Sequence, residues 1–505
     1  MERVRANVKR QALYCDMLGS ARWVGELAQR YPAREITPLT PWFANISIHD
    51  VEITGCSTLV DVSALPEKPV KNFFFGNVKA HCDRIGKICD ATKFSMKDVR
   101  IESCDTVMRI DNCDYASFFG FSNVTTGSSV KIEKTGGECR YLNVQTYPLV
   151  PVNYQSIRPG EVWLDTEGKP IQAHGFQVTF REGKYYWYGE DKTHTLFGTN
   201  RMFGGVRCYS STDFYNWKDE GRIIEPATDP HSPLHHCQKL ERPHILYCAK
   251  TGRYVCWLKS QSNDGHFVIL EAEHFMGPYH FVRNLKPNGF AVGDFDMYAD
   301  PDTGKGYVWF ERPHREQICA ELSDDYTNVN GRYSEHFVGK VPPFTREAAA
   351  HFVMDGKHYI YTSGTTSYTP NPSEVAVFDD YHGEYTVLGN PHIGDEYAHS
   401  FCSQITSVIK IPGKDLYVAM ADRWLPHTNK TDIPKKDWQS FLTRYKDHRP
   451  YPKDFATPKV ADRFYTLVNP NQDVYKATYV FLPIVVKDGI PMIEWKDEWK
   501  LENYE

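Results

Sequence analysis

The sequence predicts an all-β protein in which a short right-handed parallel β-helix precedes a five-bladed β-propeller. Two repeats support this fold class. Near the N-terminus, apolar segments recur every twenty to thirty residues or so, roughly the period of one β-helix coil. Further along the chain, aromatic-rich hairpins recur at roughly fifty to seventy residues, a spacing typical of propeller blades. At 505 residues the chain is long enough to hold both parts as separate domains.

The predicted β-helix covers residues 1–145. Three of its segments align, namely FANISIHDVEITGC, VKNFFFGNVKAHC and ATKFSMKDVRIESC. In each segment an apolar residue precedes a valine by the same spacing, as Ile46 precedes Val51 and Phe73 precedes Val78. Equivalent apolar residues of successive coils stack in such a fold, so these positions are predicted to fill its core.

The predicted linker, residues 146–160, is marked by its proline and glycine content. The predicted propeller follows over residues 161–505. Each of its hairpins combines a glycine-containing turn with an aromatic strand: REGKYYWYGE, KTGRYVCWLKS, PDTGKGYVWFE, MDGKHYIYTSG and PGKDLYVAMADRW. Because the innermost strands of all blades face one central channel, polar residues just before these hairpins are expected to converge on one site.

Glu347 is the leading candidate for a catalytic acid. It lies in FTREAAAHF between a turn and a strand, and the alanines after it leave room for another group beside the carboxyl. A carboxylic acid positioned in this way can donate a proton to a leaving group. Taken alone, a Glu beside Arg346 is also typical of a solvated surface pair. The corresponding polar residues of the other blades are His174, Glu190, Glu241, Asp294, Asp296 and Gln404.

These propeller motifs resemble glycoside hydrolase family 43, and in particular its exo-β-1,3-galactanase branch. The resemblance covers nearly all of residues 160–500 through AHGFQ, YYWYGEDK, ERPHILY, DFDMYADPDTGKGYVWF, FTREAAAHF, CSQITSV and ADRW. It implies an inverting exo-glycoside hydrolase that releases galactose from β-1,3-galactan or related side chains. In such an enzyme one carboxylic acid protonates the leaving oxygen, and a base activates water on the opposite face of the sugar.

The resemblance also implies roles for single residues. Glu347 occupies the position of the general acid, and Asp296 that of the carboxylate that orients the acid and tunes its pKa. The blade-one Asp that usually serves as base is replaced by His174 and a glycine. Gln404 matches a glutamine of the galactanase branch, which either acts through its imidic tautomer or positions the attacking water. The substrate-binding candidates are Glu190, Glu241, His174, Tyr188 and Trp424, although the aromatic residues also suit a plain core.

The N-terminal segments KRQALYCDMLGS and TPWFANISIHDVEITG resemble the late coils of the polygalacturonase family, glycoside hydrolase family 28. The Asn-Thr-Asp, Asp-Asp and Gly-His-Gly motifs that carry catalysis in that family are absent from residues 1–145. We therefore expect the β-helix to be catalytically silent. An open first coil exposes a strand edge, so either residues 5–34 cap it or the natural protein extends further upstream.

Composition and charge exclude some partners. A net charge of −6 argues against nucleic acid as a partner, and no apolar run is long enough to span a membrane.

The 13 cysteines show no zinc-type spacing and are predicted to be reduced and mostly buried. The charged N-terminus lacks the apolar centre of a signal peptide. The chain as written is therefore expected in the cytoplasm, or secreted or periplasmic if a further segment precedes it.

The expected partner is an oligo- or polysaccharide, and the implied reaction requires no cofactor. Family 43 propellers sometimes hold calcium in the central channel, where His351 or His399 could approach it, directly or through water. Calcium prefers oxygen ligands, so these histidines argue for it only weakly.

Two other functions stay open from the sequence. One is an α-L-arabinofuranosidase or galactofuranosidase on the same propeller, and the other is a non-catalytic carbohydrate-binding protein. An insertion from His427 onward has no counterpart in the family and is expected to line or cover the pocket.

Overall fold

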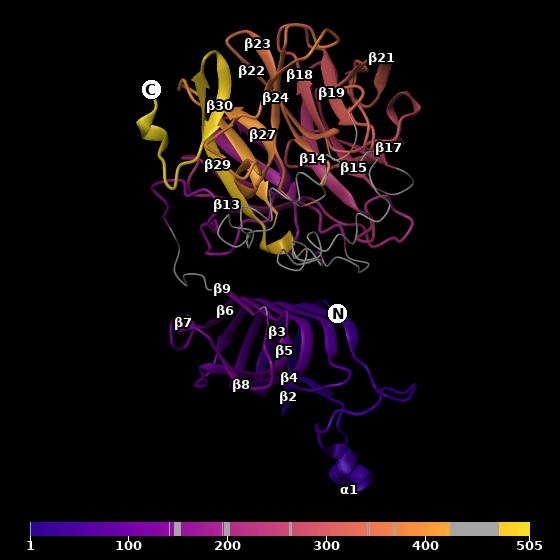
Figure 1. The fold of residues 1–505 in the computed structure, drawn as a ribbon, viewed down its shortest axis with the longest axis vertical. Coiled ribbons are helices and arrows are strands. Elements are labelled where there is room, and N and C mark those ends of the chain that lie inside the picture. The colour runs from indigo at the N-terminus through magenta and orange to yellow at the C-terminus, as the bar shows by residue number, and fades with distance from the viewer. Residues whose placement is uncertain are drawn as a thin grey trace. The chain divides into compact units, whose positions relative to one another are not determined.

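The computed structural model describes residues 2–140, 142–145, 153–193, 195, 202–261, 265–340, 342, 344–366, 368, 370–424 and 474–505. The chain divides into two compact units (Figure 1). The first is Met1–Val152 with Glu167–Lys169, and the second is Asn153–Thr166 with Pro170–Glu505. The insertion from His427 lies outside the described residues. The helical elements are single turns: α1 (Ala21–Val24), η1 (Gly25–Ala28), η2 (Pro287–Gly289), η3 (Ser400–Cys402), η4 (Val474–Lys476) and η5 (Leu501–Asn503). None of these described helices is long and apolar enough to cross a membrane.

The first unit is a parallel β-solenoid, coloured indigo to purple in Figure 1. β3 (Ala44–Ser63) and β4 (Val70–Glu102) pair in parallel, with Ile46 opposite Phe73 and Val51 opposite Val78. The predicted repeat is therefore confirmed. The remaining strands of the unit are β1 (Glu2–Asn7), β2 (Gln11–Asp16), β5 (Val107–Asp114), β6 (Ser117–Asn123), β7 (Ser128–Ser129), β8 (Lys131–Gly136) and β9 (Asn143–Gln145).

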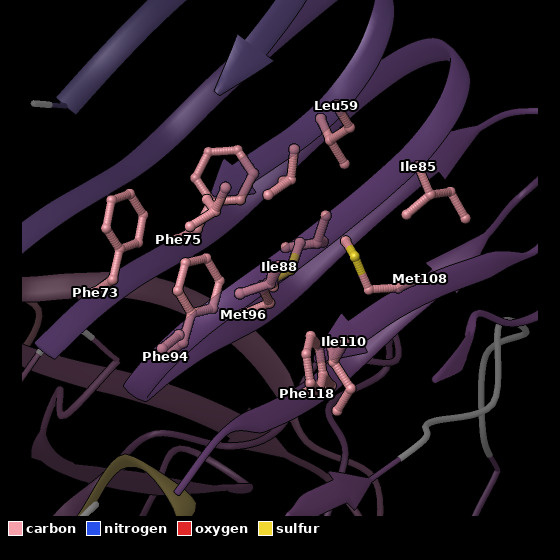
Figure 2. Packing of buried hydrophobic residues seen from close by; sticks show 14 of the residues in the cluster. Leu59, Phe73, Phe75, Ile85, Ile88, Phe94, Met96, Met108, Ile110 and Phe118 are labelled. Carbon is pink, nitrogen blue, oxygen red and sulfur yellow. The ribbon is translucent and has the colours of Figure 1, made fainter. Parts of the chain in front are cut away.

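The solenoid core is a column of apolar side chains from successive coils, shown in Figure 2. Phe73 and Phe94 stack in this column with their ring centroids 4.9 Å apart. At one corner, Asn45 and Asn72 both have a left-handed backbone, and Asn72 Nδ2 donates to Asn45 Oδ1 at 2.8 Å. Asparagine adopts this conformation more readily than most residues, so stacked asparagines let the strands turn the corner of each coil.

The 13 cysteines, all of which lie within the described ranges, form no disulfide, and most are buried as predicted. In the propeller, burial raises the pKa of Cys208, Cys256 and Cys319. A buried thiol that stays protonated is a poor nucleophile and acts as a small apolar side chain. These cysteines are therefore core residues.

The second unit is a five-bladed β-propeller, coloured magenta to yellow in Figure 1, as the aromatic hairpins predicted. Every blade contains four antiparallel strands, and the first two of them are one of the predicted hairpins. In the last blade, β26 adds a fifth strand that pairs in parallel with β30. The strands of the first three blades are β10 (His174–Arg181), β11 (Lys184–Glu190), β12 (Val206–Ser211), β13 (Lys218–Ile224), β14 (Leu240–Cys248), β15 (Arg253–Ser260), β16 (His266–Ala272), β17 (His280–Leu285), β18 (Phe295–Ala299), β19 (Gly306–Glu311), β20 (Gln317–Leu322) and β21 (Val329–His336). Those of the last two are β22 (Arg346–Met354), β23 (Lys357–Gly364), β24 (Glu374–Phe378), β25 (Thr386–Gly389), β26 (His392–Ile393), β27 (Gln404–Lys410), β28 (Tyr417–Arg423), β29 (Thr478–Lys487) and β30 (Ile490–Glu494).

The first strands of the blades form a closed ring in the order β10, β14, β18, β22 and β27, with β27 next to β10. At the closure, Gln172 Nε2 donates to the carbonyl of Tyr475 at 3.0 Å. Residues 153–160, which the sequence assigns to a linker, belong to this unit, because Ile157 exchanges two backbone hydrogen bonds with Trp499. Their proline and glycine residues mark bends of a packed segment rather than a free connection.

Candidate active site

A pocket of about 100 Å³ lies in the propeller. Its side chains come from the beginnings of first strands, the ends of second strands and the loops beside them, and all five blades contribute. The lining residues are Glu190, Lys239, Glu241, Arg242, Lys259, Gln261, Asp294, Glu347, Tyr368, Gln404 and Trp424.

A repeated β-bulge directs side chains into this pocket. The register of β14 shifts just after Glu241, that of β22 shifts just after Glu347, and β10 carries the same irregularity near its start. The residues that follow, Arg242 and Ala348, adopt left-handed φ angles of 52° and 49°. A bulge bends its strand and changes the direction of the neighbouring side chain. The same local device in different blades therefore brings Glu241 and Glu347 to one pocket.

Glu347 and Gln404 contact each other in the pocket. Gln404 Nε2 donates to Glu347 Oε1 at 3.3 Å and to Ser363 Oγ at 3.0 Å. Desolvation raises the pKa of Glu347 well above that of an ordinary glutamate, and the nearby carboxylates of Asp294 and Glu311 raise it further. Glu347 therefore retains a proton at a pH where ordinary carboxylates are ionised.

The side-chain carbonyl of Gln404 is held by hydrogen-bond donors. Its Oε1 accepts from Arg242 Nη2 and from Trp424 Nε1, each at 3.0 Å. Neither a guanidinium nor an indole N–H can accept a hydrogen bond. The side chain is therefore fixed as an ordinary amide, because an imidic O–H at Oε1 would point at two donors.

A network of cations and carboxylates forms another part of the wall. Lys259 Nζ lies 2.6 Å from Glu241 Oε2 and 2.6 Å from Asp294 Oδ1, and Arg242 Nε lies 2.9 Å from Asp294 Oδ2. Burial favours the neutral acids, but the cations outweigh it and lower the pKa of both Glu241 and Asp294. These two groups therefore stay ionised and accept hydrogen bonds.

Glu190 completes the carboxylate set on a different blade. Its Oε1 accepts from the backbone N–H of Arg242 at 3.0 Å, and its side chain forms an ion pair with Lys192. Burial and the charge of Glu241 raise the pKa of Glu190, while Lys192 opposes the rise. The pocket thus holds acidic groups of two kinds, ionised by ion pairing or kept closer to neutral by burial.

Comparison with known proteins identifies the domain. The family model described as Glycosyl hydrolases family 43 matches residues 176–408. Over these residues the propeller is similar to the family 43 glycosyl hydrolases. Among solved structures, one named as a GH43 β-1,3-galactosidase aligns at 26% identity with a TM-score of 0.56, covering 70% of this chain and 65% of its own length. This chain therefore spans slightly less than two thirds of that relative.

Two further solved structures align over 68% of this chain. A second GH43 β-1,3-galactosidase, solved with galactodeoxynojirimycin, is covered over 100% of its length at 27% identity and a TM-score of 0.55. An exo-β-1,3-galactanase from Clostridium thermocellum is covered over 66% at 25% identity and a TM-score of 0.52. No curated protein sequence matches the chain significantly. The family match and these structures together support a glycoside hydrolase.

The pocket brings together most of the side chains proposed from the sequence, but not all of them. Those that line it are Glu347, Gln404, Glu190, Glu241 and Trp424, and those that do not are Asp296, His174 and Tyr188.

Asp296 lies outside the pocket lining, and Asp294 takes the place predicted for it. Asp294 precedes β18, whereas Asp296 lies inside the strand. The Asp296 carboxylate accepts from the backbone N–H of Met297 at 2.8 Å and of His351 at 2.6 Å. It is therefore engaged in holding β18 against β22. Asp294 is the carboxylate that raises the pKa of Glu347, which corrects the choice made from the motif.

His174 and Tyr188 are core residues rather than sugar contacts. His174 is fully buried, with Nδ1 2.9 Å from Asp422 Oδ1 and its ring stacked on Tyr479. The hydroxyl of Tyr188 accepts from the backbone N–H of Ile245 at 3.0 Å, and its ring is buried between blades one and two. Both predictions of substrate contact are wrong, because interior packing leaves these side chains no face in the pocket.

Sequence reasoning missed several pocket residues. Lys259 stands opposite Glu241 in the β14–β15 register, so the pairing of that hairpin was a usable signal. Arg242 follows Glu241 directly within the ERPHILY motif and was passed over. Tyr368, whose ring lies 5.1 Å from that of Trp424, comes from an irregular loop without a periodic pattern to reveal it.

The residues suggested for calcium do not fit that ion. His351 is buried against Trp309 and Tyr298, and its Nε2 lies 3.0 Å from His358 Nδ1. His399 contacts the Asp395 carboxylate through Nδ1 and the Cys402 thiol through Nε2. Calcium takes six to eight oxygen ligands, and neither setting supplies such a shell among the described residues. No step of the reaction is assigned to a metal.

Proposed function

We propose that the protein is an inverting exo-β-1,3-galactosidase that removes terminal galactose from β-1,3-galactan or related side chains. The observation that carries this proposal is the contact between a protonated Glu347 and a hydrogen-bond-fixed Gln404 in one small pocket. The aligned structures at 25% to 27% identity are named β-1,3-galactosidases or an exo-β-1,3-galactanase, which supports the same substrate class. The small volume of the pocket, about 100 Å³, favours attack at a chain end.

Glu347 supplies the proton of the leaving group in this mechanism. A sugar oxygen leaves poorly unless it is protonated as the glycosidic bond breaks. Desolvation, Asp294 and Glu311 keep Glu347 protonated, while Arg242 and Lys259 keep Asp294 charged. The two carboxyl groups thus have different protonation states at the same pH, the arrangement that assigns the acid role to Glu347.

Gln404 positions the attacking water in this mechanism. The donors Arg242 and Trp424 fix its Oε1 and leave its Nε2 directed at Glu347 and Ser363. Its 3.3 Å hydrogen bond to Glu347 is the longest of these. A sugar bound between the two side chains would break this contact and leave Nε2 free to hold a water on the face opposite Glu347. The fixed amide favours this role over proton removal by the imidic tautomer.

Glu190, Glu241 and Trp424 bind the terminal sugar in the same proposal. Carboxylates accept hydrogen bonds from sugar hydroxyls. Glu241 is already held by Lys259, and Glu190 by Lys192, so little side-chain ordering remains to be done when the sugar binds. The Trp424 indole offers an apolar face to the C–H groups of the ring.

Hydrolysis of β-1,3-galactotriose, followed by proton NMR of the released sugar, tests this function. The expected product is galactose from the non-reducing end, appearing first as the α-anomer because the β-linkage is inverted. Release of the β-anomer first would refute inversion. Release of arabinose from arabinan, with galactotriose left intact, would show a furanosidase instead. Binding of galactotriose without turnover of any of these substrates would show a carbohydrate-binding protein.

A further inference from the structure

A second cavity in the propeller, of about 540 Å³, has a chemistry of its own. It shares the β27–β28 hairpin with the glycosidase pocket. Gln404 and Trp424 line the glycosidase pocket, whereas Cys402 and Arg423, close by in the chain, line the second cavity. The glycosidase mechanism uses no residue of this second cavity.

Cys402, His399 and Asp395 form a hydrogen-bonded chain at this cavity. Cys402 Sγ lies 3.3 Å from His399 Nε2, and His399 Nδ1 lies 3.0 Å from Asp395 Oδ1. Asp395 Oδ2 is fixed in turn by the backbone N–H groups of His399 at 2.8 Å and Ser400 at 2.6 Å. A nucleophile, a base and a group that orients the base thus stand in line, as covalent catalysis requires.

This geometry fits proton transfer rather than metal binding. A metal ion needs ligand atoms that converge on one point, whereas His399 contacts Asp395 and Cys402 through opposite sides of its ring. Among the described residues, the group of three whose ligand atoms lie within 4.8 Å of one another is His235, His236 and Cys237. The chain at Cys402 does not belong to it.

The surroundings of His399 favour transfer of the thiol proton. Burial alone would lower the pKa of His399, but its hydrogen bonds with Asp395 and Cys402 raise it to about 9. A basic imidazole that is hydrogen-bonded to a thiol can accept the thiol proton as the sulfur attacks. This distinguishes Cys402 from the buried cysteines of the blades, which have no such base.

The turn that carries Cys402 is firmly held. Ser400, Phe401 and Cys402 have left-handed φ angles of 55°, 54° and 57°. Ser400 Oγ donates to the carbonyl of Asn371 at 2.7 Å, and Ser403 Oγ donates to the carbonyl of Ser400 at 2.7 Å. Non-glycine residues in this region are strained, and such strain persists where the surrounding structure enforces it. The thiol is therefore held in place beside its base.

Arg423 places N–H donors beside the thiol. Its Nη2 donates to the carbonyl of Phe401, the residue before Cys402, at 2.9 Å. Its Nε is buried and has no hydrogen-bond partner among the described residues. A donor of this kind can stabilise the oxyanion that forms when a carbonyl is attacked. Tyr397 and Trp495 add aromatic surface to the same cavity, which suits a flat, uncharged acyl group.

We propose that this cavity is a second catalytic site that hydrolyses small neutral carboxylic esters, with Cys402 as nucleophile, His399 as general base and Asp395 as the residue that positions His399. The Cys402 sulfur attacks the carbonyl carbon while His399 takes the thiol proton. The carbon–oxygen bond then breaks, and the alcohol leaves with that proton, giving a thioester. Water attacks the thioester, its proton returns through His399 to the sulfur, and the carboxylic acid is released.

Ester hydrolysis by the full-length protein tests the proposal, with 4-nitrophenyl acetate and methyl cinnamate as probes. Cys402→Ala and His399→Gln should each lower the rate by roughly 100-fold or more, the usual contribution of a nucleophile or base. Glu347→Gln is the matched control, because it disables the glycosidase pocket and should leave ester hydrolysis unchanged. Retained galactoside hydrolysis by Cys402→Ala shows that this variant is folded. Ester hydrolysis that changes less than about threefold in both variants overturns the proposal.

Alkylation by iodoacetamide, read peptide by peptide by mass spectrometry, gives an independent measurement. Cys402 should react before the exposed Cys104 and Cys237 in the native protein, and His399→Gln should abolish this preference. Slower labelling of Cys402 than of Cys104 would show that the thiol is not activated and would overturn the proposal. Fast labelling of Cys402 without turnover of either ester would overturn the assignment to ester hydrolysis.

Discussion

Replacement of Glu347 by Gln is the sharpest test of the glycosidase site, because it removes the proton donor and keeps the shape of the side chain. General acid catalysis contributes about two to four orders of magnitude in rate, or about 3 to 5 kcal/mol of transition-state stabilisation. The fold should survive. The hydrogen bond to Gln404 is 3.3 Å long, so its loss costs at most about 1 kcal/mol, and the neutral amide replaces a carboxyl group that is already protonated.

The assay compares substrates whose leaving groups need different amounts of help. On β-1,3-galactobiose, the kcat of Glu347→Gln should fall by roughly 100- to 10,000-fold. On 2,4-dinitrophenyl β-galactoside, whose phenol leaves without a proton, the loss should stay below about tenfold. Glu335→Gln, the same change at an exposed position of β21, is the matched control and should alter neither rate. Near-normal hydrolysis of the disaccharide by Glu347→Gln would refute the assignment of the acid.

The remaining predictions concern water, pH, metal and the solenoid. Gln404→Ala should slow both substrates alike, because water must attack whichever group leaves; a loss confined to the disaccharide would contradict this role. Burial raises the pKa of Glu311 to about 8. The contribution of neutral Glu311 to the free energy of unfolding is therefore complete below the unfolded pKa of about 4.3 and is lost as pH rises through about 8. Glu311→Gln stays neutral and should therefore gain Tm relative to the parent protein as the pH rises from about 5 to about 8, with the difference levelling off above that; an unchanged difference in Tm would argue against that pKa. Treatment with EDTA should alter neither Tm nor galactoside hydrolysis, and a fall in either would reveal a bound ion. Glu347→Gln protein should release no galacturonic acid from polygalacturonate, whereas release would place a second glycosidase in the solenoid.

The sequence by itself determines the two architectures, because periodic packing leaves a periodic pattern. Equivalent residues of stacked coils must all be apolar, so the spacing of Ile46 and Val51 returns at Phe73 and Val78. Each blade likewise needs a turn followed by a strand with a large buried face. The same logic brings out Glu347 and Gln404, since residues at the beginning of each first strand face the same channel. The packing of 153–160 onto Trp499 has no such repeat and is seen only in the folded unit.

Tertiary structure decides which polar residues reach the pocket and in which protonation state. Asp294 and Asp296 stand two positions apart in one motif, yet backbone N–H groups of β18 and β22 take up the second and leave the first in the pocket. The ionised state of Asp294 depends on Arg242 and Lys259, which come from another blade. The proposed reactivity of the Cys402 thiol depends in the same way on the imidazole of His399, which the turn places beside it. Distances of a few ångströms set these electrostatic energies, and a one-dimensional pattern carries no information about them.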